Sequence, residues 1–153
     1  MATNIEVAYA PFRASLLAGG FDLPDSGAWG AELIAAHVAR NNDLVADAAE
    51  AVLRGEEVIY DNALAIDEVE LRRYAEEAGD VDELAREVGR TAARLERVYE
   101  ELGSRRDTVI EVRIQDSGAI VFEGPMPVGE FIELNASRHL SAHYDQIHSL
   151  HGP

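Results

Sequence analysis

Three of the five histidines in this chain stand where helical spacing would bring their rings together. His139 and His143 are four positions apart, so on a helix their rings project side by side from one face. His37 lies on another predicted helix, also within an apolar face. Imidazole nitrogens bind divalent transition metals, and three such ligands leave at least one coordination position open. The three histidines therefore predict a metal site with room for a ligand.

Amide side chains accompany these histidines on the predicted core faces. Asn41 shares the apolar face of His37, and Asn135 and Gln146 share that of His139. A buried polar group that lacks a partner costs about 1–3 kcal/mol, so this concentration of polar groups needs an explanation. We expect Asn41, Asn135 and Gln146 to bind a cofactor or to support the metal ligands. A hydrogen-bonded core cluster without a metal is the alternative.

The remaining candidates for chemistry have simpler interpretations. His148 falls on the opposite, solvated face of the last predicted helix, and His151 lies in the tail, so both are interpreted as surface residues. Trp29, near the start of the second predicted helix, is interpreted as a packing anchor.

Alanine-rich stretches with apolar residues at spacings of three and four predict a mainly helical chain. Pro11 predicts a kink or a helix start within the first helix, and Asp80 with Glu83 forms a capping-box-like pair before the third. A loop at 55–66 precedes a short polar helix near 67–78. The predicted main helices span a part of residues 4–18, then 28–53 with Ser26 as its cap, 81–102, and 128–150.

A change of period before the last helix predicts a β-hairpin. Ile110, Val112 and Ile114 alternate with polar residues, as in a half-buried strand. Residues 116–118 form the expected turn, AIVFE the return strand, and GPMP its end. We therefore predict an all-α fold, a single-domain four-helix bundle over residues 1–153 with a small β-hairpin before the last helix.

Composition excludes several classes of function. The 153 residues carry 29 acids and 13 bases, a net charge of −16, which disfavours binding to nucleic acid or to an anionic membrane. No cysteine is present, so cysteine metal ligands, a cysteine nucleophile and disulfides are excluded. All the bases are arginine, which excludes a lysine Schiff base. No long apolar run or signal-peptide pattern occurs, and we expect a cytoplasmic protein.

Two runs of sequence resemble a known family. WGAELIAAHVARNNDLV, with Trp29 eight residues before His37, is similar to the second-helix signature of the DinB/YfiT-like superfamily. PMPVGEFIELNASRHLSAHYDQI is similar to its last-helix metal motif, with His139 and His143 as the pair. The segment between resembles, in layout, the N-terminal domain of mycothiol-dependent maleylpyruvate isomerase. That branch usually has glutamate where this chain has His139, so the chain resembles the general DinB pattern more closely.

The resemblance implies an up-down-down-up four-helix bundle, often a homodimer, with a divalent metal such as zinc or nickel. By position, the metal ligands are His37, His139 and His143. It also implies a thiol-dependent transferase or isomerase, in which a small thiol such as mycothiol attacks an electrophilic substrate. Because the chain has no cysteine, that sulfur must come from a small molecule.

Two other functions remain open at the level of sequence. A metal-dependent hydrolase would use the same three ligands to activate water. No Asp or Glu lies on the core faces of the predicted helices 28–53 and 128–150, which counts against a general base there. A non-enzymatic bundle that binds a small ligand or forms a dimeric interaction module is the other alternative.

Overall fold

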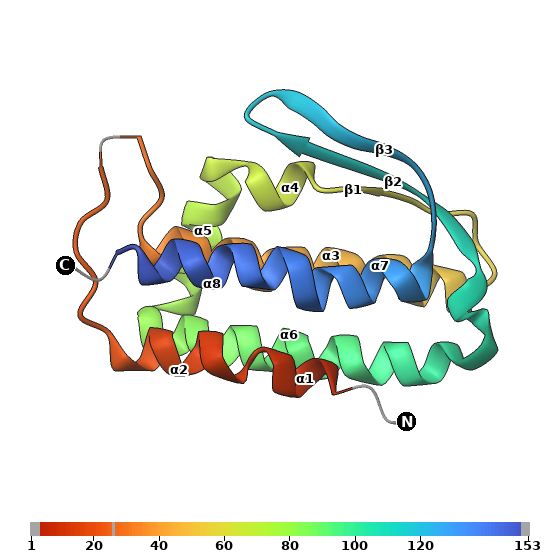
Figure 1. Cartoon of the computed structure of the whole chain (residues 1–153), viewed down its shortest axis with the longest axis horizontal. Helices are drawn as coiled ribbons and strands as arrows, with labels where there is room; N and C mark the ends of the chain where they lie inside the picture. The colour runs from red at the N-terminus through yellow and green to blue at the C-terminus, as the bar shows by residue number, and fades with distance from the viewer. Residues whose placement is uncertain (1–3, 26, 151–153) are drawn as a thin grey trace.

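The computed structural model describes residues 4–25 and 27–150, which form a mostly helical fold with one small sheet (Figure 1). Its helices are α1 (Ile5–Ala8), α2 (Ala10–Ala18), α3 (Ala31–Leu53), α4 (Ala63–Ile66), α5 (Glu68–Ala78), α6 (Val81–Leu102), α7 (Val128–Leu134) and α8 (Leu140–His148). A 3-10 segment, Gly103–Asp107, follows α6, and a π-helical turn, Asn135–His139, joins α7 to α8. The strands are β1 (Ile59–Asp61), β2 (Val109–Asp116) and β3 (Ala119–Pro127).

The long helical segments run along the longest axis of the molecule (Figure 1). Helices α3 and α6 run in one direction, and the α1–α2 and α7–α8 segments run in the other. Their apolar faces meet in one hydrophobic cluster, and each fully buried large aliphatic side chain contributes about 1.5–3 kcal/mol to folding. Its fully buried members include Leu16, Ile34, Val45, Leu84, Leu95, Ile132 and Ile147. Of the predicted all-α four-helix bundle, the mainly helical class is confirmed.

Helix α6 follows its sequence signals closely. The carboxylate of Asp80 accepts a hydrogen bond from the backbone N–H of Glu83 at 2.9 Å, which satisfies one of the free donors of the first turn. Gly103 ends the helix at a positive φ of 50°, which a residue without a side chain adopts at little cost. The predicted boundaries of this helix are confirmed.

The first predicted helix is divided into two helices next to Pro11, as this proline predicted. Helix α1 ends at Ala8 and α2 begins at Ala10, with Tyr9 between them. Pro11 occupies the first turn of α2, where a missing N–H costs no helical hydrogen bond. Tyr9 itself is buried, and its hydroxyl donates a hydrogen bond to the buried side chain of Asn42.

The predicted hairpin is present as the antiparallel pair β2–β3. Strand β3 continues through Pro127, so the prediction that GPMP ends the strand is wrong. Proline is tolerated there because β3 is an edge strand in the order β1-β2-β3. A register irregularity lies between Ile114 and Gln115, just before the turn.

Several short elements were not predicted. Strand β1 pairs in parallel with β2, and α4 follows it, within a segment that was expected to be a loop. Helix α3 begins at Ala31 after Gly30, three residues later than predicted. The proposed cap Ser26 and the tail residue His151 lie outside the described residues.

The last predicted helix begins at Val128 as expected, but the π-helical turn interrupts it. A π turn contains one residue more than an α turn, so the residues after it change phase by about 100°. None of the helices in the described ranges combines the length and apolar composition needed to cross a membrane.

Candidate metal centre

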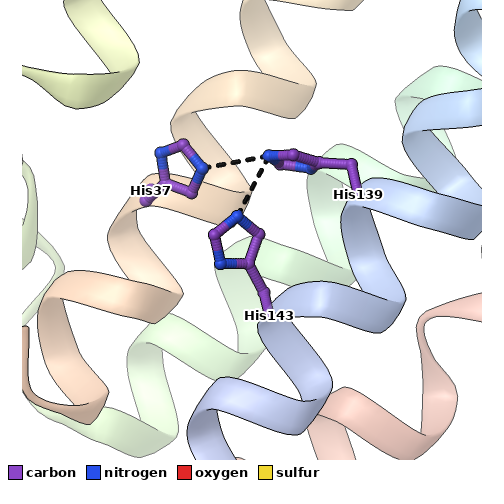
Figure 2. A group of neighbouring side chains, drawn as sticks. All are labelled: His37, His139 and His143. Atoms are coloured by element: carbon purple, nitrogen blue, oxygen red, sulfur yellow. Dashed lines mark hydrogen bonds between the residues drawn. The ribbon is translucent and has the colours of Figure 1, made fainter. Parts of the chain in front are cut away.

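Three imidazoles meet between α3 and the last helical segment (Figure 2). His37 comes from α3, His139 ends the π-helical turn, and His143 lies one turn further along, in α8. The Nε2 atom of His139 lies 3.0 Å from that of His37 and 3.1 Å from that of His143. The ligand atoms of all three lie within 4.8 Å of one another, close enough to hold a metal ion. The predicted meeting of these three residues is confirmed.

The outer nitrogens of two rings fix their tautomers. His37 Nδ1 lies 2.6 Å from the backbone oxygen of Ala65, and His143 Nδ1 lies 2.8 Å from Oε1 of Gln146. Because these oxygens only accept, each Nδ1 carries the hydrogen and donates it. In a neutral ring the lone pair is then on Nε2, which faces His139. This is the arrangement in which proteins present histidine to a metal.

The inner nitrogens cannot satisfy one another. His139 Nε2 carries at most one hydrogen, so it can donate to His37 or to His143 but not to both. The other contact brings two lone pairs together unless a cation lies between them. Metal–nitrogen bonds of about 2.0–2.1 Å at tetrahedral angles separate ligand nitrogens by about 3.3–3.4 Å, close to the two separations here. The chemistry of this donor set therefore fits a divalent metal ion.

Burial keeps the three rings neutral at ordinary pH. Loss of hydration, with a smaller contribution from His143, lowers the pKa of His37 from 6.5 to about 4. Burial also lowers the pKa values of His139 and His143, well below the ordinary value for His139. The carboxylate of Asp116 opposes this weakly at His37 and His143, because its negative charge favours the protonated rings. Neutral imidazole is the form that binds metals.

A second polar cluster, which we call the amide–tyrosine network, lies deeper in the helical core. Asn135 is its centre, since its side chain donates to Asn42 Oδ1 at 2.9 Å and to the Tyr9 hydroxyl at 3.1 Å. Its own Oδ1 accepts from Asn41 Nδ2 at 2.7 Å, and the Tyr60 hydroxyl donates to Asn41. The network consists of Tyr9, Asn41, Asn42, Tyr60, Thr91 and Asn135.

Two residues that were predicted to bind a cofactor belong to this network. Asn41 and Asn135 are 5% and 4% exposed, and their hydrogen bonds are made within the network. Neither is among the residues that line the cavity beside the histidines. Asn135 begins the π-helical turn that ends at His139, so it supports the histidine cluster through the backbone.

A cavity of about 680 Å³ lies against the three histidines, within the size range of small-ligand sites. Gln146, which the sequence predicts to bind a cofactor, lines this cavity and accepts the hydrogen bond from His143. Its walls come from the loop before α3, the α4–α5 segment, the tip of the hairpin and α8. The lining residues besides the histidines are Gly27, Trp29, Asn62, Ile66, Glu68, Gln115, Asp116, Ser117, Gly118, Ala142 and Gln146.

The hairpin tip is fastened to this cavity by paired hydrogen bonds. The side chain of Asn62 donates to the backbone oxygen of Gln115 and accepts from its backbone N–H, both at 2.9 Å. The side chain of Gln115 donates in turn to Asp61 at 3.1 Å. These contacts hold Asp116 and Ser117 at the cavity wall, although the turn lies far along the chain from His37.

Three lining residues that could bind a ligand or take part in its chemistry were not predicted as part of the site. Trp29, expected to be a packing anchor, has its ring centre 5.3 Å from that of His37 and donates its N–H to Glu68 at 3.0 Å. Glu68 and Asp116 bring carboxylates to the cavity from outside the two histidine-bearing segments. The spacing of Trp29 before His37 was visible in the sequence, but no periodicity connects the two acids to the histidines.

Comparisons of the chain with protein-family models, with curated proteins and with solved structures find no match. The resemblance to the DinB/YfiT-like superfamily therefore stays a prediction, and the donor chemistry of the site carries the functional argument.

Proposed function

We propose that this chain is a metal-dependent protein in which His37, His139 and His143 hold a divalent ion such as zinc or nickel. The observation that carries the proposal is the convergence of two Nε2 lone pairs, from His37 and His143, on the Nε2 of His139. Hydrogen bonds among the three rings leave one of these contacts unsatisfied, whereas one cation satisfies both. Zinc and nickel both suit imidazole, and their choice follows availability as much as affinity.

The arrangement of the helices supports a bundle of the DinB-like type. Two long segments run in each direction, in the chain order that an up-down-down-up bundle requires, and a hairpin precedes the last segment (Figure 1). The order and spacing of Trp29, His37 and the later histidine pair support the same assignment.

The activity that we propose is thiol-dependent transfer or isomerisation. A metal in this site would favour the thiolate form of a coordinated thiol, which is the nucleophilic form. The Ala65 carbonyl and the Gln146 side chain orient two of the ligand rings, and the cavity has space for a thiol beside an electrophile. The thiol would be a small molecule, because the chain has no cysteine, and mycothiol is the example that the DinB-like resemblance suggests.

Hydrolysis is a second candidate, favoured by one observation. Glu68 and Asp116 line the same cavity as the histidines, so a carboxylate stands available as a general base. The sequence argument against a hydrolase considered only the two histidine-bearing helices, and the acids come from other segments.

Metal content tests the basis of both activities. Protein purified without a nickel column or a histidine tag should contain, or take up after chelation, about one equivalent of divalent metal. Less than about one-tenth of an equivalent, with no uptake of added zinc or nickel, would contradict the proposal.

Thiol dependence separates the two activities. The metal-loaded protein is assayed with electrophiles and with ester or amide substrates, with and without added thiol. Turnover that requires the thiol supports transfer or isomerisation, and turnover without it supports hydrolysis.

A further inference from the structure

The charged side chains of the cavity all have one sign. Among the described residues that line it, the ionised side chains are those of Glu68 and Asp116. The chain has 13 arginines, but none of them is among these lining residues. Beyond the histidines and the ion that they would hold, the charged side chains that a ligand meets in this lining are therefore carboxylates.

We propose that the cavity selects small thiols whose distal end carries a positive charge, such as an ammonium group, over thiols whose distal end is anionic. This inference rests on the proposed metal and thiol function and names the class of thiol for that site. The sulfur end meets the histidine cluster, and the distal end meets Glu68, Asp116 and the ring of Trp29.

Glu68 and Trp29 form one side of the distal region. The indole N–H donates to Glu68 Oε1 at 3.0 Å, which holds the carboxylate beside the aromatic ring. An aromatic face next to a carboxylate is a favourable environment for an ammonium group, through cation–π attraction and charge pairing. Arg72 lies 3.8 Å from Glu68, but both side chains are more than half exposed, so solvent screens this pair.

Asp116 supplies the second negative charge from the hairpin tip. The paired bonds between Asn62 and Gln115 fix the residue before it, so the carboxylate is held at the cavity wall. The hydroxyl of Ser117 donates a hydrogen bond to Asp116 at 3.1 Å. An anionic distal group would be repelled from both sides of the cavity.

Cobalt(II)-loaded protein provides a direct measurement. A bound thiolate gives a charge-transfer band with cobalt, and because the chain has no cysteine this band arises only from an added thiol. Titration with cysteamine, 2-mercaptoethanol and thioglycolate gives dissociation constants for thiols of similar length with cationic, neutral and anionic ends. We expect affinity to fall in that order, and the preference to weaken as salt is added.

A charge-neutralising variant isolates the contribution of the two acids. The double variant Glu68→Gln/Asp116→Asn should reduce the ratio of cysteamine to thioglycolate affinity by roughly tenfold. Differences in thiol acidity and chelation among the probes cancel, because the same thiols are compared in both proteins. The control Glu100→Gln/Asp107→Asn removes the same charge from exposed positions that do not line the cavity, and should leave the ratio unchanged.

The outcomes separate the inference from the function on which it rests. A ratio that is the same in the wild-type protein and the Glu68/Asp116 variant, or an equal fall in the control, overturns the charge selectivity alone. Cobalt binding without a thiolate band for any probe overturns the thiol function and the selectivity together. A fall confined to the Glu68/Asp116 variant supports both.

Discussion

The amide–tyrosine network and the histidine cluster are both polar groups within the helical core, yet their hydrogen bonding differs. In the network the amide of Asn135 both donates and accepts, and the hydroxyls of Tyr9 and Tyr60 donate to neighbouring amides. In the histidine cluster, lone pairs from His37 and His143 converge on one nitrogen of His139. No buried side-chain nitrogen or oxygen in the described part of the chain lacks a contact at hydrogen-bond distance, so distance alone does not separate the clusters.

This difference distinguishes a structural polar cluster from a binding site. Donors and acceptors match in the network, whereas the histidine cluster has one acceptor too many and needs a further partner. The network members are at most 5% exposed, whereas the histidines border a cavity of about 680 Å³. The amide–tyrosine network therefore stabilises the fold, whereas the histidine cluster is suited to bind a metal ion.

The largest expected effect is the loss of metal affinity when one histidine ligand is removed. We expect His143→Ala to weaken metal binding by more than about 100-fold, because a direct ligand matters more than the residues that support it. Competition with a chromogenic chelator measures the affinity. His148→Ala is the matched control, since it removes an exposed histidine from the same helix, and it should bind metal normally. Equal affinity in the wild-type protein and His143→Ala would show that His143 is not a ligand.

Acid should distinguish the two clusters in the metal-free protein. Because the pKa of His37 is about 4 when folded and about 6.5 when unfolded, the unfolded chain binds the extra proton first as pH falls. The stabilising contribution of neutral His37 is complete above about pH 6.5 and is lost progressively as the pH falls toward 4. From His37 alone we expect a loss of about 2 kcal/mol in unfolding free energy by pH 5.

The network should not respond over this range, because burial raises the pKa values of Tyr9 and Tyr60 above that of a free tyrosine. Urea unfolding with a chelator at pH 7.5 and at pH 5 makes the measurement. A protein equally stable at both values would contradict the neutral burial of His37. Adding metal at pH 7.5 should stabilise the fold by mass action.

Breaking the network should cost stability. We expect Asn135→Leu to lower the unfolding free energy of the metal-free protein by about 1–3 kcal/mol, because Asn41 loses an acceptor inside the core. Chemical unfolding measures it. Ser137→Ala is a control from the same π turn, and its exposed hydroxyl should matter by less than about 0.5 kcal/mol. An Asn135→Leu protein as stable as the wild type would show that the network contributes little.

The smallest effect is expected from Gln146, which lines the cavity and orients His143. Gln146→Leu removes the acceptor that orients His143 and should weaken metal binding by about tenfold, as for other residues behind a metal ligand. The same chelator competition resolves this change. Gln146→Glu, which keeps an acceptor oxygen, should restore affinity, and a failure of both variants alike would indicate a steric rather than an orienting role.

The sequence predicted what is periodic and missed what is short or brought together by tertiary packing. Helix α6 was predicted to its ends because its apolar stripe, Asp80 and Gly103 agree. The meeting of the histidines followed from two apolar faces that had to pack. Strand β1 and helix α4 are too short to establish a period, and the π turn inserts a residue without a sequence signal. Asp116 lies at the cavity where Asn62 holds the hairpin tip, and Glu68 comes from the start of α5, so neither acid shares a helical period with the histidines.

The separation of the histidines along the chain has a consequence for the order of events in the cell. His37 and His139 are 102 residues apart. At a synthesis rate of about 5–20 residues per second, the ribosome adds His139 roughly 5–20 seconds after His37. The His37 imidazole on α3 therefore cannot contact the other two histidine rings before that time has passed. Under the proposed function, an ion that needs all three imidazoles can therefore bind only after His143 has been synthesised.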